Sequence, residues 1–341
     1  MERKFIVLTK KANALCEIES FDYNPENLKD NEAVIETSMS LISAGTELSR
    51  VYEIKQGFSY PVYPGYTTIG KVLAKGKNVE GVEVGDRIFC TAHHASINIH
   101  KQLNKTQGSQ LFKMDERLTD KQMCLVQMGM IAMNAVNACN GRITDTVAVY
   151  GLGTIGIITA LLFKSAGMRV IAFDPIKSRC ELTRELGIEE VYDCTPDKQV
   201  EILKSITDGK GADINIDVSG ISGAINNCVL GAAKHGQVIL LGSPRASFTC
   251  DVTPIFNAIH MKMLEVKGAF NELDPFYEVE GTRKNVLRNI KAVERLLLDG
   301  TIDADKLISH VIKPEQIMEA YHGLMYDREV YHCVAIDWKG E

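Results

Sequence analysis

Three glycines at positions 151, 153 and 156 form the spaced pattern GLGTIG, which suits the binding of a dinucleotide. Gly151 permits a tight turn, Gly153 lets a pyrophosphate approach the backbone, and Gly156 allows a following helix to sit close to the preceding strand. The N-terminus of that helix offers unpaired N–H groups and the positive end of its dipole to the phosphates. The pattern therefore predicts a phosphate-binding turn, whose remaining members are Leu152, Thr154 and Ile155.

Asp174 ends the apolar stretch RVIAFD, where the adenosine ribose of a dinucleotide would lie. A carboxylate there accepts hydrogen bonds from the ribose hydroxyls and repels a 2′-phosphate, so the sequence favours NAD over NADP. Two alternatives stay open. Asp174 could cap the next helix, with Pro175 at the first helical position. Lys177 or Arg179, the latter also a cofactor-binding candidate, could instead pair with the phosphate of NADP.

Two histidines stand next to each other in the stretch FCTAHHASINIH, directly after a predicted strand. Histidine titrates near neutral pH and needs no metal to act as a base. We therefore predict that His93 or His94, with a preference for His94, acts in catalysis or substrate binding. The alternative is a solvated loop. The spacing of the other histidines suggests no metal site, and we interpret them as structural.

The elements that would hold the cofactor residues alternate regularly. Nearly wholly apolar stretches (TVAVY, RVIAFD, EEVYD, ADINIDVSG and QVILLG) are each separated by one amphipathic helical stretch. Such strands indicate a parallel sheet that is covered by helices on both faces, and the fold class is therefore α/β. Two of the later strands end in small polar residues, which we expect at the nicotinamide end of the site: Ser219, Gly220, Gly242 and Ser243.

The rest of the chain has a different pattern of apolar and turn-forming residues. Short β-branched stretches broken by Gly and Pro fill the first 125 residues and suit a mostly antiparallel, barrel-like domain. The tail contains a charged amphipathic helix, then a second helix and a closing strand. We expect residues 275–341 to pack back on residues 1–125, so that residues 126–274 form an inserted dinucleotide-binding domain.

Composition excludes several classes of function. The net charge is −6, with Lys and Arg scattered among the acids, which leaves no cationic surface for nucleic acid or an anionic membrane. No apolar run is long enough to span a membrane or to resemble a secretory signal. The nine cysteines are dispersed, without a C-x-x-C pair, and indicate reduced thiols in a cytoplasmic protein.

The order of motifs along the chain resembles the medium-chain dehydrogenase/reductase superfamily, which includes the alcohol and polyol dehydrogenases. The matching stretches are AGTELS, PGYTTIGKV, VEVGDRIF, GRITDTVAVYGLGTIG, DGKGADINIDVSG, HGQVILLGS and the tail DADKLISHVIKPEQIMEAYHGL. The resemblance implies a GroES-like β-barrel catalytic domain and a Rossmann domain with a doubly wound parallel sheet. It also implies hydride transfer with a small-molecule substrate, and a homodimer or homotetramer.

Zinc-dependent members of that superfamily bind the catalytic metal through a Cys before G-T-D, a His in G-H-E, and a Cys or Glu before the cofactor domain. The corresponding residues here are Ala44, Tyr66 and Gln127. A methyl group and an amide cannot replace a thiolate or a carboxylate on zinc, and tyrosine is a poor ligand unless it is ionised. The segment that holds a structural zinc in many members contains no Cys here. The sequence thus predicts a member without zinc.

Without a metal, a hydroxyl or an imidazole must move the proton that accompanies hydride transfer. Tyr66, at the former ligand position, suits the role of an acid because its unperturbed pKa is about 10. The alternative is that Tyr66 only lines a cleft or the core. Thr46 falls at the superfamily's proton-relay hydroxyl and Glu47 at its second-shell acid, although either could simply cap a helix or pair with Arg50.

The leading hypothesis is an NAD-dependent oxidoreductase that oxidises a secondary alcohol of a sugar, cyclitol or similar small polar compound without zinc. A zinc-free quinone or enone reductase is the second hypothesis, although Asp174 argues against the NADPH that such enzymes usually use. The third is a catalytically silent NAD-binding protein.

Overall fold

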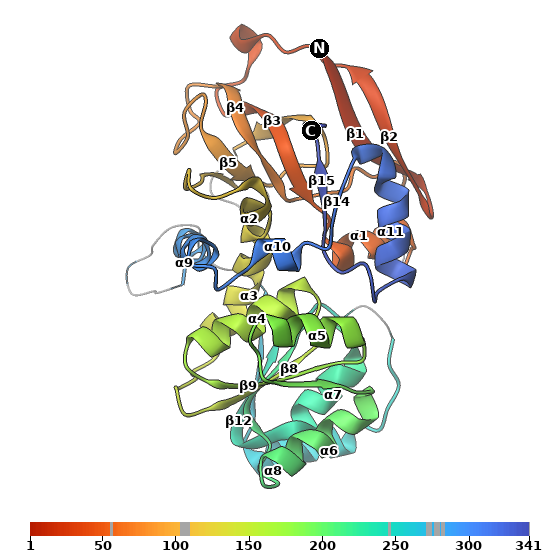
Figure 1. Ribbon diagram of the computed structural model, residues 1–341, viewed down its shortest axis with the longest axis vertical. Coiled ribbons are helices and arrows are strands. Elements are labelled where there is room, and N and C mark those ends of the chain that lie inside the picture. Colours follow the sequence, from red (N-terminus) through yellow and green to blue (C-terminus); the bar gives the residue numbers. More distant parts are fainter. Residues whose placement is uncertain are drawn as a thin grey trace. The chain divides into compact units, whose positions relative to one another are not determined.

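A computed structural model describes residues 1–54, 57–102, 110–244, 247–270, 275, 280 and 284–340. The chain forms two compact units (Figure 1). Unit 1 comprises Met1–Gln127 with Pro275–Glu341, and unit 2 comprises Met128–Asp274.

Unit 2 is built on one six-stranded parallel sheet with the strand order β10-β9-β8-β11-β12-β13. The strands are β8 (Thr146–Tyr150), β9 (Arg169–Asp174), β10 (Glu190–Asp193), β11 (Ala212–Asp217), β12 (Ala232–Leu240) and β13 (Glu265–Gly268). The chain runs outward in one direction from β8 and then returns to continue in the other from β11. This is the doubly wound order of a dinucleotide-binding sheet, which confirms the predicted fold class.

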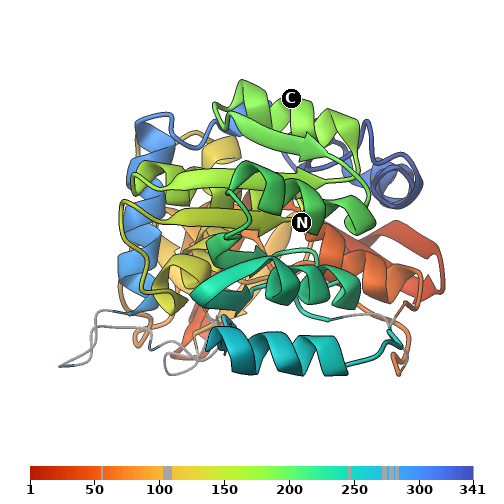
Figure 2. The same cartoon turned by 90° about the horizontal axis from the view of Figure 1, so that it is seen from below.

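In the described part of unit 2, five helices connect the strands: α4 (Thr154–Ser165), α5 (Lys177–Glu185), α6 (Pro196–Ile206), α7 (Ser222–Gly231) and α8 (Thr253–Lys262). Right-handed crossovers place α4 and α5 on one face of the sheet and α6, α7 and α8 on the other. Helices α7 and α8 lie side by side, as Figure 2 shows. Both faces are therefore covered, which explains why the central strands β8 and β9 are almost wholly apolar and buried.

Unit 2 differs from the sequence-based expectation at two places. The helical stretch predicted between ADINIDVSG and QVILLG ends at Gly231, and the following residues belong to β12 because Ala232 pairs with Ala212 of β11. Alanine favours helices locally, but pairing in the sheet overrides that propensity. The structure also adds α8 and the edge strand β13, which the alternation of apolar stretches did not reveal.

Stacked aromatic rings fill the core of unit 2 beneath the ends of its strands. The rings of Tyr150 and Phe173 have centroids 5.3 Å apart, and those of Phe173 and Tyr192 lie 5.7 Å apart. These residues come from β8, β9 and β10, and Tyr150 and Phe173 are fully buried. The packing holds the carboxyl ends of the strands in place, from which the glycine turn and Asp174 emerge.

Unit 1 contains a sheet with the order β14-β15-β3-β4-β5-β7, and β6 also pairs with β3. Its strands are β3 (Glu32–Leu41), β4 (Thr68–Lys75), β5 (Arg87–Cys90), β6 (Ile97–Lys101), β7 (Leu111–Lys113), β14 (His310–Ile312) and β15 (Val334–Asp337). All pairs are antiparallel except β14 with β15. A separate hairpin joins β1 (Glu2–Lys10) and β2 (Asn13–Ser20). Because β15 pairs with β3, the C-terminal segment forms part of the N-terminal sheet.

The helical segments of unit 1 are short, apart from α9. They are η1 (Pro25–Asn27), α1 (Ala44–Val51), α2 (Asp120–Cys124), α9 (Val286–Leu298), α10 (Ala304–Leu307), η4 (Pro314–Gln316) and α11 (Ile317–Tyr326), while α3 (Val126–Ala138) begins in unit 1 and continues into unit 2. Helix α1, which the sequence analysis did not foresee, packs against α11. A shared apolar cluster includes Leu48 and Val51 of α1, Tyr321 of α11 and Ile336 of β15.

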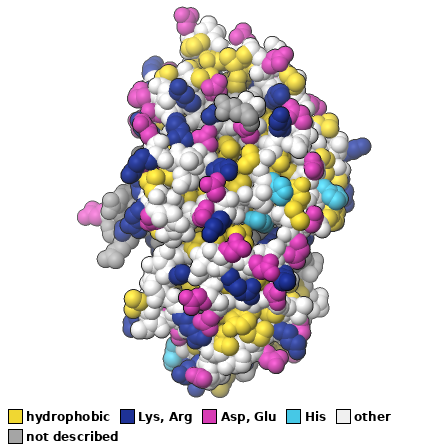
Figure 3. Space-filling model, viewed as in Figure 1, with side chains coloured by type: hydrophobic (Ala, Val, Ile, Leu, Met, Phe, Trp, Pro, Cys, Tyr) yellow, Lys and Arg dark blue, Asp and Glu magenta, His cyan; other side chains and the backbone are white. Residues whose placement is uncertain are grey.

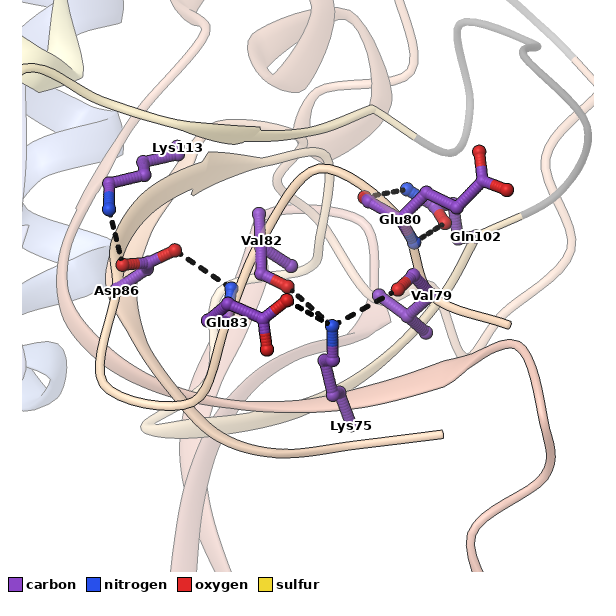
Figure 4. A network of polar contacts seen from close by, with 8 residues as sticks. All are labelled: Lys75, Val79, Glu80, Val82, Glu83, Asp86, Gln102 and Lys113. Carbon is purple, nitrogen blue, oxygen red and sulfur yellow. Dashed lines mark hydrogen bonds and ion pairs between the residues drawn. The ribbon is translucent and has the colours of Figure 1, made fainter. Parts of the chain in front are cut away.

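A polar network closes the connection between β4 and β5 (Figure 4). The Lys75 ammonium group donates to the carbonyl oxygen of Val82 and to Glu83 Oε1, both at 2.8 Å. Asp86 accepts from the Glu83 backbone at 2.8 Å and from Lys113 at 2.7 Å. The network supports the register of β4 on β5. Strand β4 begins directly after Thr67, so this register also fixes where the segment with Tyr66 and Thr67 enters the sheet.

Charged groups of both signs are interspersed over the face of the molecule seen in Figure 3. Within the described ranges, no helix is long and apolar enough to cross a membrane.

Candidate active site

The glycine turn lies between β8 and α4, as the sequence predicts. Gly151 has a φ angle of 100°, and a Cβ atom on Gly156 would lie 1.8 Å from the Gly151 carbonyl oxygen. Both positions therefore require glycine. Gly153 is the N-cap of α4, and a Cβ atom there would meet nothing within 4 Å. The turn thus leaves open space beside Gly153, at a helix N-terminus suited to a phosphate.

Asp174 connects this turn to the end of β9. Its Oδ2 atom accepts a hydrogen bond from the Leu152 backbone at 2.7 Å, and Oδ1 accepts one from the Ile176 backbone at 2.9 Å. Asp174 is only 3% exposed. Helix α5 begins at Lys177 with Ile176 as its N-cap, so Asp174 does not cap that helix and Pro175 lies outside it.

Arg179 of α5 lies close to the same carboxylate, with its Nη1 atom 3.9 Å from Asp174 Oδ2. Each carboxylate oxygen has a second lone pair that could accept a ribose hydroxyl. A cation at this distance lessens the repulsion that Asp174 alone would exert on a 2′-phosphate. A nucleotide bound at this position would therefore meet Asp174 and Arg179 together and not the carboxylate alone.

The ends of β11 and β12 meet at the same edge of the sheet. Asp217 Oδ1 accepts from the Ser219 hydroxyl at 2.7 Å, and Oδ2 accepts from the Gly220 backbone at 3.2 Å. A Cβ atom on Gly220 would lie 2.3 Å from the Ser243 carbonyl oxygen, and one on Gly242 would lie 2.3 Å from Gly220 N. The structure therefore brings these four predicted residues together. Asp217, which organises two of them, was missed, although its place at the end of an apolar strand was a usable signal.

The glycine turn and this second group are neighbours. A Cβ atom on Gly151 would lie 3.1 Å from the Ser219 Cβ atom. Thr154 starts α4, and Ile155 accepts a hydrogen bond from the Thr159 hydroxyl through its carbonyl oxygen at 2.7 Å. All the predicted cofactor residues thus gather at the carboxyl edge of the parallel sheet or at the start of α4 or α5, where open sheets of this order bind ligands.

In unit 1, Glu47 of α1 is the centre of a buried polar network and is 1% exposed. Its carboxylate accepts from the Ser43 backbone at 2.7 Å and from the Tyr321 hydroxyl at 2.6 Å, and lies 3.1 Å from His94 Nε2. Burial by itself raises the pKa of Glu47, but the attraction and hydrogen bond of His94, with those of Tyr321 and Ser43, hold that pKa below its ordinary value. Glu47 therefore pairs with His94 and not with Arg50.

His94 is completely buried, so the alternative of a solvated loop is wrong for this residue. Its Nδ1 atom lies 2.8 Å from the Ser40 hydroxyl, which also accepts a hydrogen bond from the Trp338 indole at 2.9 Å. Since the indole only donates, Ser40 can direct its own hydrogen to Nδ1, which leaves Nε2–H for Glu47. Such a histidine cannot touch a substrate without a rearrangement of its surroundings.

His93 has a different environment from its neighbour. It is exposed, and its ring centroid lies 6.2 Å from that of Tyr63. Desolvation, followed by the nearby His94 and Arg3, lowers the pKa of His93 below its ordinary value. His93 is thus the member of the pair that a solute can reach.

Tyr66 and Ser43 form the closest pair of hydroxyl groups at this site, with their oxygen atoms 2.5 Å apart. Tyr66 is half-buried and follows Gly65, whose φ angle is 100°. Ser43 is the N-cap of α1, but its side chain makes no capping hydrogen bond. The sequence analysis missed Ser43, whose signal was a serine directly before the helix AGTELSRV.

Thr46 also lies on α1, where it is exposed. Its backbone N–H donates to the Ser43 carbonyl oxygen at 3.0 Å. Arg50, one turn further along the same helix, places its guanidinium group 5.9 Å from the centre of the Phe58 ring. Both side chains remain candidates for contact with a polar substrate.

The three positions that the resemblance assigns to catalytic zinc do not provide a zinc ligand set. Ala44 offers a methyl group, the Tyr66 hydroxyl is engaged with Ser43, and Gln127 offers a buried amide whose Oε1 atom has no hydrogen-bond partner among the described residues. Zinc in proteins requires thiolate, imidazole or carboxylate ligands. The part of the chain that the structure describes contains no group of three or more His, Cys, Asp or Glu side chains able to hold a metal ion.

Sequence comparison relates the chain to known proteins. Residues 154–282 match a family model described as "Zinc-binding dehydrogenase". The L-threonine 3-dehydrogenase of Caldanaerobacter subterraneus is 30% identical over 253 residues, which cover 67% of this chain and 72% of that protein. The (R,R)-butanediol dehydrogenase of Bacillus subtilis is 25% identical over 289 residues, 78% of each protein.

Solved structures share the fold at lower identity. A protein from Escherichia coli CFT073, described as a short chain alcohol dehydrogenase complexed with NADH, has a TM-score of 0.77 at 18% identity and covers 98% of this chain and 99% of its own. A protein from Sinorhizobium meliloti 1021, determined with bound NADP, has a TM-score of 0.78 at 17% identity, with 99% of both chains covered. At these identities the comparison establishes the fold alone.

Proposed function

The chain belongs to the medium-chain dehydrogenase/reductase superfamily, and from this premise we propose that it is an NAD-dependent dehydrogenase that acts on a secondary alcohol without zinc. The proposed substrate is a sugar, a cyclitol or a similar small polar compound. The observation that carries the proposal is the pair of hydroxyl groups of Tyr66 and Ser43, 2.5 Å apart, because Tyr66 stands at the position that the resemblance assigns to a metal ligand.

The glycine turn and Asp174 support a nicotinamide cofactor. The open space beside Gly153 suits a pyrophosphate, and Asp174 is held against the turn by Leu152. We propose NAD because a buried carboxylate at the end of β9 favours ribose hydroxyls over a 2′-phosphate. The structural relatives hold NADH in one case and NADP in another, so the fold is compatible with both.

The proton step would use the hydroxyl pair. When bound, the nicotinamide supplies or accepts hydride at its C4 atom. In ketone reduction, Tyr66 donates its proton to the substrate oxygen, and the Ser43 hydroxyl donates a hydrogen bond to the phenolate that remains until solvent returns a proton. In alcohol oxidation, the same phenolate accepts the hydroxyl proton of the substrate. A phenol with an ordinary pKa of about 10 favours the reductive direction at neutral pH.

The same acidic phenol favours reduction of a quinone or enone as the second candidate function. In that reaction, hydride adds to the conjugated carbon and a proton follows on the neighbouring atom, so no metal is required. Asp174 argues against this candidate because reductive members usually use NADPH.

We also propose that the protein is a cytoplasmic homodimer or homotetramer. The edge strand β13 and the helix α8 expose apolar side chains, among them Phe256 at 63%, Met261 at 66% and Val266 at 42%. Among the described residues, no strand pairs with the outer edge of β13, and such an edge beside apolar side chains suits pairing with a second copy. Light scattering of the purified protein tests this proposal, and a monomeric mass at micromolar concentration would overturn it.

The test of function follows the absorbance of NADH with purified protein, NAD and a panel of sugars, cyclitols and secondary alcohols. We expect NADH production with at least one polar secondary alcohol and far less turnover with NADP. If no alcohol on the panel is oxidised although NADH binds, the proposal of an alcohol dehydrogenase is wrong. Quinones and enones with NADH would then be the substrates to test.

A further inference from the structure

We infer that the buried pair of His94 and Glu47 positions the hydroxyl pair of Tyr66 and Ser43, so that His94 and Glu47 are positioning residues and not catalytic ones. This inference rests on the proposed function, because it assigns the proton step to Tyr66. The inference gives this positioning role to His94 and not to the adjacent His93, since His93 is exposed whereas His94 is completely buried.

The first connection runs from Glu47 to Ser43. A serine N-cap usually accepts a hydrogen bond from the first turn of its own helix through the side chain. Ser43 makes no such bond, and Glu47 Oε1 instead accepts from the Ser43 backbone N–H at 2.7 Å. The Ser43 hydroxyl is therefore directed to Tyr66, while Glu47 holds the Ser43 backbone in place.

The second connection runs from His94 to the segment that carries Tyr66. The His94 backbone N–H donates to the Pro64 carbonyl oxygen at 2.9 Å. A Cβ atom on Gly65 would lie 2.7 Å from His94 N, 2.8 Å from Cγ and 2.9 Å from Nδ1. The backbone at Gly65 therefore lies directly against the imidazole, and the position of Tyr66 depends on the placement of that ring.

The third connection anchors the pair to the C-terminal segment. The Tyr321 hydroxyl donates to Glu47 Oε2 at 2.6 Å, and Trp338 donates to Ser40, which contacts His94 Nδ1. Both ring nitrogens of His94 are thus engaged. Four separate parts of the chain, with Ser40, Glu47, His94 and Tyr321, converge on one buried network. It contacts the Ser43 backbone directly and reaches Tyr66 through the backbone of Pro64 and Gly65, the two residues before it.

The charged and titratable groups around Glu47 are few. His94 and Tyr321 contact its carboxylate directly. Arg50 acts more weakly by opposing the increase in the pKa of Tyr321 that burial and Glu47 cause. The test below separates the geometry of the hydroxyl pair from the stability of the fold.

The test uses two substitutions of one histidine. In His94→Gln the amide nitrogen can occupy the place of Nε2 and keep the contact with Glu47, whereas in His94→Asn the amide reaches only the place of Nδ1 and its contact with Ser40. We expect His94→Asn to lower kcat by up to about 10²-fold, the loss that a misplacement of about 1 Å can cause. His94→Gln should recover most of this loss, and the Kd for NADH should stay unchanged in both.

A double-mutant cycle with Tyr66→Phe distinguishes positioning from stability. If His94 acts through Tyr66, His94→Asn should have little further effect on kcat once the phenol is absent. If His94→Asn lowers kcat by the same factor with and without Tyr66→Phe, the inference is wrong. If Tyr66→Phe alone leaves kcat unchanged, the proposed function is wrong, and the structural test decides about positioning by itself.

The structural test needs no substrate. Crystal structures of the variants should show the Tyr66 and Ser43 oxygens beyond hydrogen-bond distance in His94→Asn and within it in His94→Gln. An intact hydroxyl pair in His94→Asn would overturn the inference. If His94→Asn fails to fold, Tyr321→Phe provides a milder change, with the same expected separation. The matched control is Tyr52→Phe, because the Tyr52 hydroxyl is buried without a hydrogen-bond partner among the described residues. It should leave the hydroxyl pair and kcat unchanged.

Discussion

The backbone N–H of Leu152 donates a hydrogen bond of 2.7 Å to the carboxylate of Asp174. The residue expected to recognise the ribose is thus also part of the support of the phosphate-binding turn. A substitution at Asp174 should therefore affect both the choice of cofactor and the geometry of the turn.

Replacement of Asp174 by Ser should weaken NADH binding by between about 10- and 100-fold, because hydrogen bonds to a charged group contribute about 1.5–3 kcal/mol. Binding of NADPH should improve, since Arg179 remains close to the vacated position. Fluorescence titration with both nucleotides measures the change. An unchanged ratio of the two dissociation constants would show that Asp174 does not determine specificity.

Tyr66→Phe removes one hydroxyl group from the pair with Ser43. We expect kcat to fall by about 10²–10⁴-fold, the usual contribution of general acid–base catalysis, with little change in the Kd for NADH. Ser43→Ala keeps the phenol but removes its hydrogen-bond partner, so its loss should be smaller. Steady-state kinetics of both variants tests whether Tyr66→Phe loses more kcat than Ser43→Ala. A Tyr66→Phe variant as active as the natural protein would contradict it.

The glycine turn offers a matched pair of substitutions. Gly156→Ala should destabilise the fold by about 1–3 kcal/mol, since its Cβ atom would overlap the Gly151 carbonyl oxygen. Gly153→Ala should preserve the free energy of unfolding, because a Cβ atom there meets open space, yet weaken NADH binding by filling the proposed phosphate site. Urea unfolding and NADH titration of both variants separate these effects. Equal NADH affinity in Gly153→Ala and the natural protein would argue against a phosphate at this position.

The free energy of unfolding that Glu47 contributes should decrease on acidification. The pKa of Glu47 is lower in the folded protein than its ordinary value of about 4.3. A carboxylate with a lowered pKa contributes stability that is present above the unfolded pKa and is lost as the pH falls through the folded one. The difference in unfolding free energy between the natural protein and Glu47→Gln should therefore stay constant between pH 7 and 5 and shrink as the pH falls below about 4.3. Urea unfolding measures it, and a difference that grows on acidification would contradict the prediction.

Chelation should leave the enzyme active. The positions of Ala44, Tyr66 and Gln127 supply no thiolate, imidazole or carboxylate, so we expect full turnover after dialysis against a strong chelator. Metal analysis of the purified protein should accompany the assay. Stoichiometric zinc whose removal abolishes turnover would show that the proposed zinc-free mechanism is wrong.

The sequence by itself determined the fold class and the glycine turn because both depend on local patterns. Apolar strands separated by amphipathic helices indicate a covered parallel sheet at any position in a chain, and the spacing of Gly151, Gly153 and Gly156 reports the geometry of a single turn. The prediction of an α/β protein with a doubly wound sheet is confirmed by the strand order of unit 2. The boundary between α7 and β12 was wrong because helix propensity at Ala232 is local, whereas its pairing with Ala212 is not.

Only the tertiary structure decided how the polar residues of unit 1 are arranged. Glu47 meets Tyr321 across 274 positions in sequence and His94 across 47. Contacts of this kind depend on the antiparallel sheet and on the return of the C-terminal segment to it, and no short sequence pattern records them. Burial distinguished the adjacent histidines for the same reason, since only the folded chain packs His94 against Ser40 and Glu47 and leaves His93 exposed. The hydroxyl pair of Tyr66 and Ser43 likewise appears only once α1 and the segment before β4 are folded together.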